Sequence, residues 1–152
     1  MKRFLTVGLG FIFIGIGIAQ AAPPADANQE VVTEAKGAIK KAKVFFIEPK
    51  DGATVATKFK VKMGVEGMTI KKAGESVDDV TSGHHHIVID GTAIPAGQPV
   101  MANETHIHFG AGQTETELTL KPGNHTLILQ FADGAHRSFG PALSQTIKIK
   151  VK

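Results

Sequence analysis

Cysteine is absent from the 152 residues of this chain. No disulfide can therefore stabilise the fold, even in an oxidising compartment, and no thiolate is available as a nucleophile or as a metal ligand. A site for a soft metal ion would have to use histidine and methionine side chains. The chain has seven histidines and four methionines.

Familiar catalytic motifs are also missing. The sequence contains no G-x-S-x-G nucleophile turn, no H-E-x-x-H zinc motif and no phosphate-binding glycine loop, since its glycines fall at turns. Ser82 lies near a run of histidines, but no base that would activate it is evident. The sequence therefore favours a binding protein over an enzyme, and we assign no catalytic residue.

A large excess of charge of one sign is lacking as well. Residues 1–21 contain two of the 17 basic residues and none of the 14 acidic residues, so the remainder carries 15 minus 14, a net charge of +1. A nearly neutral chain offers little electrostatic attraction for a polyanion. We therefore expect no nucleic-acid partner.

The first 21 residues have the features of a secretory signal peptide. Lys2 and Arg3 precede the uncharged apolar run 4–18, and Ala19-Gln20-Ala21 forms an A-x-A cleavage site. The run is nearly long enough for a membrane-spanning helix, so an uncleaved anchor is the alternative. The Ala/Pro stretch that follows favours cleavage, and we expect a periplasmic or secreted protein that is not attached to the membrane after cleavage.

The rest of the chain divides into a tail and one domain. Residues 22–42 show no sustained apolar stripe and are interpreted as a flexible N-terminal tether. Residues 43–152 consist of short runs rich in Val, Ile, Phe and Thr, separated by turn-forming residues, as in an all-β domain. The predicted strands are Val44–Ile47, Thr57–Val65, His84–Ile89, Thr105–Phe109, Thr114–Leu120, His125–Phe131 and Gln145–Val151. About seven short strands at this spacing predict an immunoglobulin-like antiparallel β-sandwich.

Alternation within these strands predicts which side chains are buried. Lysines alternate with apolar residues around Val61 and around Ile149, so each of those strands should have one face in the core and one in water. Met63 belongs to the apolar face and is predicted to be a core residue. The predicted core comprises Phe59, Val61, Ile87, Ile89, Ile107, Phe109, Leu118, Leu120, Leu127, Leu129, Phe131, Ile147 and Ile149.

Five of the seven histidines fall in two short predicted strands, and the first of these contains three in a row. Successive side chains of a strand point to opposite faces. His85 therefore shares a face with Ile87 and Ile89, whereas His84 and His86 face the other way. If the isoleucines lie in the core, His84 and His86 point away from it.

The second histidine strand shows the same alternation. His106 and His108 share one face, and Ile107 and Phe109 share the other. If the two histidine strands are neighbours, four imidazoles converge on one patch outside the core. The predicted ligands are His84, His86, His106 and His108.

Several imidazoles on one rigid sheet face suit a transition metal. Copper is favoured by the general order of metal affinities, and zinc is its competitor. A surface strand with solvated histidines is the alternative interpretation. Further candidate ligands are His85, His125, His136, Asp90 and Met101.

The motifs around these histidines resemble a known bacterial secreted family. The segments GHHHIVID at 83–90, THIHFGAGQTET at 105–116 and PGNHTL at 122–127, with the ending at 132–151, are similar to domain of unknown function 4399. The likeness covers about residues 60–152 and implies a secreted β domain without assigning an activity. It marks as motif positions His84, His85, His86, His106, His108 and His125.

The H-x-H followed by Phe109-Gly110 is also similar to the copper-binding strand of copper-zinc superoxide dismutases. That likeness covers a handful of residues, and the other motifs of those enzymes, including their disulfide cysteines, are missing. We use it as an analogy about strand geometry. It keeps a copper redox enzyme among the hypotheses.

Three functions from different classes follow from these observations. The leading one is a periplasmic protein that carries or buffers copper through a histidine cluster, with another periplasmic protein as a candidate partner. The second is a metal-free immunoglobulin-like interaction module. The third is a copper redox enzyme, which requires an open coordination position.

Overall fold

The structure is a computed structural model that describes residue 37 and residues 41–152. The predicted signal peptide 1–21 and most of the predicted tether 22–42 lie outside the described residues. Within the described part, no helix combines the length and the apolar character needed to cross a membrane.

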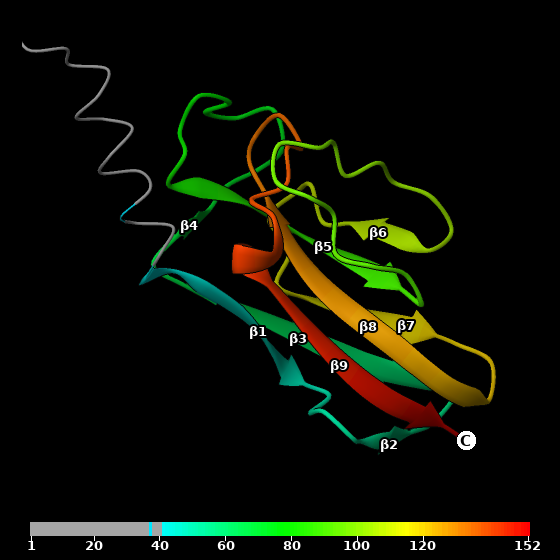
Figure 1. The fold of residues 1–152 in the computed structure, drawn as a ribbon. Coiled ribbons are helices and arrows are strands. Elements are labelled where there is room, and N and C mark those ends of the chain that lie inside the picture. Colours follow the sequence, from blue (N-terminus) through cyan, green and yellow to red (C-terminus); the bar gives the residue numbers. More distant parts are fainter. Residues whose placement is uncertain (1–36, 38–40) are drawn as a thin grey trace, which may run out of the picture.

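The regular elements of the described chain are strands, apart from one short 3₁₀ helix (Figure 1). Each of the seven predicted strands is present, with its ends within two residues of the prediction. In chain order the elements are β1 (Lys43–Glu48), β2 (Thr54–Val55), β3 (Lys58–Glu66), β4 (Thr69–Ile70), β5 (Ser82–Ile89), β6 (His106–His108), β7 (Glu115–Thr119), β8 (Gly123–Ala132), the 3₁₀ helix η1 (Pro141–Leu143) and β9 (Ser144–Val151).

The strands form two sheets. One has the order β1-β3-β7, and the other has the order β9-β8-β5 at its centre, with β2 beside β9 and both β4 and β6 beside β5. Pairing is antiparallel except at the two-residue edge strands β2 and β4. The first, second and fifth predicted strands thus lie opposite the third, fourth, sixth and seventh. This is the immunoglobulin-like arrangement, and it confirms the predicted fold class.

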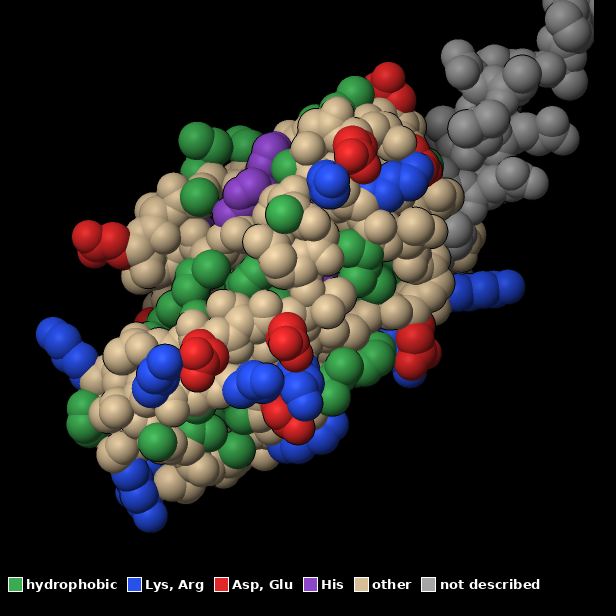
Figure 2. All heavy atoms as spheres, turned by 180° about the vertical axis from the view of Figure 1, so that it is seen from behind, with side chains coloured by type: hydrophobic (Ala, Val, Ile, Leu, Met, Phe, Trp, Pro, Cys, Tyr) green, Lys and Arg blue, Asp and Glu red, His purple; other side chains and the backbone are tan. Residues whose placement is uncertain are grey.

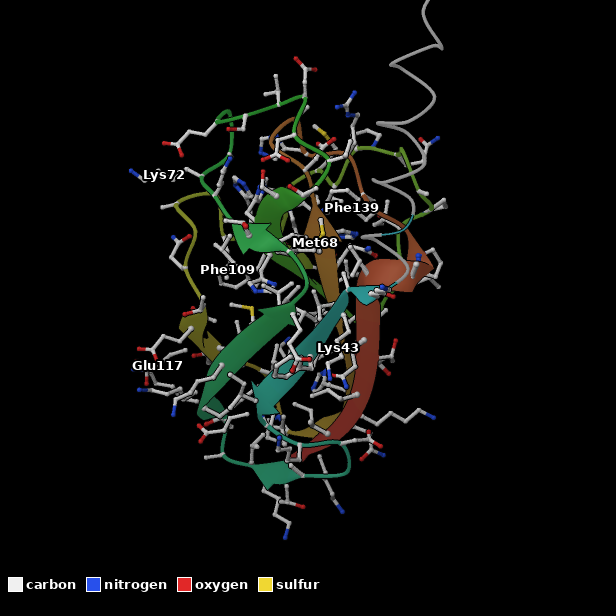
Figure 3. All side chains as sticks on the ribbon, turned by 90° about the vertical axis from the view of Figure 1, so that its left-hand side faces the viewer. Lys43, Met68, Lys72, Phe109, Glu117 and Phe139 are labelled. Carbon is white, nitrogen blue, oxygen red and sulfur yellow. The ribbon has the colours of Figure 1, made fainter. Side chains whose placement is uncertain are left out.

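The core lies between the two sheets. In β3 the side chains of Phe59, Val61 and Met63 are buried and the lysines between them are exposed or half-buried, as the alternation predicted. Eleven of the thirteen predicted core residues are buried, and Ile107 and Leu120 are half-buried and packed against the others. Phe109 and Met68, labelled in Figure 3, lie near the end of the sandwich that carries β4.

The outer face of the second sheet is also covered, which explains why every residue of β5 is buried. Two loops, at 90–104 and 133–140, fold over this face. Gln130 of β8 holds both: its Oε1 accepts a hydrogen bond from the Ile94 N–H at 3.1 Å, and its Nε2 donates to the Gly140 carbonyl at 3.0 Å. Ser138 Oγ also donates to the Ile94 carbonyl. The face that carries His84 and His86 is therefore enclosed and not open to solvent.

Candidate metal centre

Strand β5 places its histidines on both faces of the sheet. His84 and His86 lie on the covered outer face, whereas His85 points to the core side and stacks edge-on against Phe131, with ring centroids 5.1 Å apart. All three are 0% exposed. The alternation of side chains along the strand predicted this division.

The register between β5 and β6 decides which other histidine joins them. His108 lies directly opposite His86, and their rings stack with centroids 5.0 Å apart. His106 lies opposite Val88, one pair further along, and its Nδ1 is 3.0 Å from Asn103 Oδ1. The predicted convergence of four imidazoles therefore holds for three of them and not for His106, which is on the expected face but beyond reach.

His136 takes the place that His106 was expected to fill. It comes from the loop after β8, is half-buried, and has its Nε2 3.1 Å from the Nε2 of His108. Its ring centroid is 4.8 Å from that of His108 and 5.0 Å from that of His84. We call His84, His86, His108 and His136 the four-histidine cluster.

A buried carboxylate shapes the turn that presents His136. Asp133 Oδ1 accepts hydrogen bonds from the Ala135 and Arg137 N–H groups at 2.9 and 2.8 Å, and its Oδ2 pairs with Arg137 Nε at 2.7 Å. His136 itself has the left-handed backbone conformation, with φ of 64°. Such a conformation is uncommon for a residue with a side chain and costs on the order of 1 kcal/mol or more, so the surrounding contacts must hold it.

Two glycines of the histidine motifs are explained by close packing. A Cβ built at Gly110 would overlap Cε1 and Nε2 of His108, so the missing side chain leaves room for that ring. A Cβ at Gly83 would overlap the Ala132 carbonyl of β8, which lies against β5 at this point. Gly110 therefore makes room for a histidine of the cluster, and Gly83 lets β8 lie close against β5.

The ring nitrogens of the cluster approach one another in two pairs. His84 Nε2 lies 3.0 Å from His86 Nε2, and His108 Nε2 lies 3.1 Å from His136 Nε2. Each pair can share one proton, so one nitrogen donates and the other accepts. The Nδ1 atoms of His84 and His86 are buried without any partner in the described structure. An unpaired buried polar atom costs about 1–3 kcal/mol of folding free energy, so two such atoms in one cluster call for an explanation.

The separations fit a bound transition metal. With metal–nitrogen bonds of about 2.0–2.1 Å, two ligand nitrogens lie about 2.9 Å apart at a right angle and about 3.4 Å apart at the tetrahedral angle. The two Nε2 pairs fall in that interval. Ligand atoms of His84, His86 and His108 all lie within 4.8 Å of one another. Opposite ligands of one ion are about 4.1 Å apart, so small ring rotations would complete the contacts.

Burial favours the neutral form of His84, His86 and His108, which is the protonation state that a metal ligand needs. Desolvation, helped by the neighbouring His136 and His108 rings, lowers the pKa of His84 to about 4, although Asp133 acts in the opposite direction. Desolvation and the same crowding lower the pKa of His86 further, and desolvation lowers that of His108. At neutral pH these imidazoles are therefore free to bind a cation without releasing a proton first.

A pocket of about 310 Å³ leads from the surface to the cluster. Its wall includes His108 and His136 from the cluster and the exposed Met101 from the covering loop. The remaining lining residues are Pro99, Val100, Ala102 and Ala135. Figure 2 shows histidine side chains reaching the surface together in a hollow beside hydrophobic side chains.

The other proposed ligands lie elsewhere or are already engaged. His125 Nδ1 is 2.7 Å from Asp90 Oδ2 and its Nε2 is 2.9 Å from the Lys121 carbonyl, so both ring nitrogens have acceptors. The hydrogen bond to Asp90 is the main reason that the pKa of His125 is raised. The structure does not bring His125 or His85 to the cluster.

One of the comparisons with known proteins identifies a family. The family model described as Domain of unknown function (DUF4399) matches residues 61–152, in agreement with the motif resemblance. No curated protein sequence matches the chain.

Two solved structures are similar to the chain at a low level. One is an endo-beta-1,4-mannanase from Thermotoga petrophila, at 19% identity and a TM-score of 0.43, and the match covers 74% of this chain and 20% of that one. The other contains fibronectin(III)-like modules of Clostridium thermocellum CbhA, at 19% identity and a TM-score of 0.41, covering 74% of this chain and 47% of that one. The chain thus spans under half the length of either structure.

Proposed function

We propose that this chain, which belongs to the DUF4399 family, is a periplasmic protein that carries or buffers copper on the four-histidine cluster. The observation that carries the proposal is the pairing of Nε2 atoms in a covered site, at 3.0 Å between His84 and His86 and at 3.1 Å between His108 and His136. Each neutral imidazole has one nitrogen lone pair to give, so four rings whose Nε2 atoms converge this closely could hold one metal ion between them.

The donor set favours copper over zinc. The cluster offers imidazole nitrogens without a thiolate, and structural zinc sites usually contain cysteine. Among divalent ions of the first transition row, copper binds nitrogen sites most tightly and accepts a square arrangement of four nitrogens. Zinc, with its tetrahedral preference, is the competitor that a binding measurement must include.

An immunoglobulin-like sandwich alone would suit a metal-free interaction module equally well. A metal-free module has no use for four imidazoles whose Nε2 atoms lie 3.0 and 3.1 Å apart in pairs, whereas a metal site would use all four rings. The metal-binding function is therefore the better supported of the two.

The experiment is a metal analysis of the protein made without a histidine tag and recovered from the periplasmic fraction. We expect an N-terminus near Ala22 and about one copper per chain. A variant with His84→Gln and His86→Gln, prepared in parallel, should contain none. Intact Met1 in the membrane fraction would contradict the location, and wild-type protein that holds no copper after exposure to it would contradict the function.

A further inference from the structure

Copper must have a route to a site whose first two ligands are fully buried. His84 and His86 are 0% exposed, and the sheet and the covering loops close around them. The pocket that contains Met101 reaches the other two members, His108 and His136. Exchange of the ion through this pocket requires no opening of the sheet.

Backbone hydrogen bonds hold the two walls of the pocket together. The Val100 N–H donates to the His136 carbonyl at 2.9 Å, and Ser138 N–H donates to the Gln98 carbonyl at 2.9 Å. Met101 therefore follows directly after the residue that is bonded to His136. Met101 is 68% exposed, so a copper donor or acceptor in solution can reach its thioether.

The chemistry of the wall selects for a soft ion. Besides the two histidines, the pocket is lined by Met101 and by small apolar residues, with no carboxylate among them. Calcium and magnesium need oxygen ligands, which this wall does not supply from side chains. A thioether is a ligand for monovalent copper, and it binds that ion without deprotonation.

We propose that Met101 and His136 form the entry port of the copper site, through which monovalent copper passes between solution and the buried histidines. Met101 takes the ion at the mouth, and His136, whose Nε2 already lies 3.1 Å from His108 Nε2, passes it inward. The ion keeps its oxidation state throughout. This inference rests on the proposed copper function. It adds to that function the oxidation state of the copper that is exchanged and the route that the ion takes.

The test compares two methionine variants by the rate of copper transfer and by equilibrium affinity. Met101→Leu keeps the apolar wall but removes the sulfur, and Met68→Leu makes the same change at a half-buried residue packed against the core (Figure 3). Protein loaded with copper(I) under reducing conditions is mixed with bathocuproine disulfonate, and transfer is followed by absorbance. Copper(I) affinity is measured separately by equilibrium competition with the same chelator.

We expect Met101→Leu to slow copper(I) transfer about tenfold while copper(I) affinity stays within about twofold of wild type. Met68→Leu should leave both unchanged. Wild-type rates in Met101→Leu would overturn the port and leave the proposed function standing. A parallel loss of copper(I) affinity would overturn it too, because Met101 would then be an equilibrium ligand. Failure of the wild-type protein to bind copper would overturn both proposals.

Discussion

At the scale of single residues, Gly110 bears on the geometry of the metal site as directly as the histidines do. The H-x-H-F-G motif ends in a glycine because the ring of His108 occupies the space where a Cβ would lie. Gly110→Ala should therefore displace His108 from the cluster and weaken copper binding by about tenfold or more, which a competition titration would measure. The loss follows from misplacing one of four ligands while leaving its chemistry intact.

A matched glycine variant separates this effect from general destabilisation. Gly52, in the turn between β1 and β2, has open space where a Cβ would lie but a φ of 76°, so Gly52→Ala introduces backbone strain away from the cluster. It should lower the free energy of unfolding and leave copper affinity near that of wild type. Equal losses of affinity in the two variants would mean that the packing of Gly110 against His108 has no special role.

His85 gives a second prediction at this scale. Both of its ring nitrogens are buried without a partner, and it lies on the core side against Phe131. Its replacement by leucine removes an unsatisfied polar group from an apolar environment, so His85→Leu should raise the free energy of unfolding by about 1–3 kcal/mol. Copper affinity should stay within about twofold of wild type. Urea unfolding and copper titration of this variant would check both, and a large loss of affinity would place His85 among the ligands.

At the scale of elements, an ion pair fastens the start of β8 to the end of β5. Asp90 accepts hydrogen bonds from the Thr126 N–H and from His125. Desolvation raises the pKa of Asp90, but these hydrogen bonds outweigh it and the net shift is downward. The hydrogen bond to Asp90 raises the pKa of His125 above 6.5.

The sign of the resulting pH dependence follows from linkage. Because the folded pKa of His125 is raised, its contribution is fully present below the unfolded value of 6.5 and is lost as pH rises through the folded pKa. The Asp90 contribution is present above 3.8 and is lost as pH falls through the lower folded pKa. The Asp90–His125 pair should therefore stabilise the protein most at pH values between 3.8 and 6.5. In metal-free protein, urea unfolding of wild type and His125→Gln should differ more at pH 5.5 than at pH 8.5. A difference that grows with pH would contradict this account.

The elements also mark the limit of sequence-based prediction. Alternation placed His84 and His86 opposite Ile87 because side-chain direction has a period of two along any strand. The register of β6 against β5 is set by tertiary packing, so nothing in the motif could distinguish His106, opposite Val88, from His108, opposite His86. The edge strands β2 and β4 were not predicted because two residues are too few for a pattern.

His136, the member of the cluster that comes from a loop, is the clearest case of a residue whose position the local sequence could not predict. His136 was one candidate among several, since only the fold brings the turn after β8 over the outer face of β5. The roles of Asp133 and Gln130 were missed for the same reason. The pair Asp133-Gly134 indicates a turn and nothing more. Gln130 lies in a strand that is otherwise apolar, and no pattern there predicts its hydrogen bonds to both covering loops.

At the scale of the whole molecule, copper binding and folding should be coupled. The cluster joins β5, β6 and the loop after β8, and it exists only in the folded chain, so the ion binds the native state preferentially. At free copper 100-fold above the dissociation constant, stabilisation is about 2.7 kcal/mol, or roughly 10–20 °C in Tm for a domain of this size. Scanning calorimetry with and without copper(II) would measure the rise. An unchanged Tm at saturating copper would contradict a buried site.

The most direct test is a copper(II) competition titration of two double variants at pH 7.5. His84→Gln/His86→Gln removes two members of the cluster, and His106→Gln/His125→Gln removes two histidines that the structure places outside it. Circular dichroism would first establish that both variants keep the β-sheet spectrum of wild type. We predict that the first variant loses at least 100-fold in affinity and that the second binds one copper ion as wild type does. Equal losses in both, or unchanged binding in the first, would contradict the four-histidine cluster as the metal site.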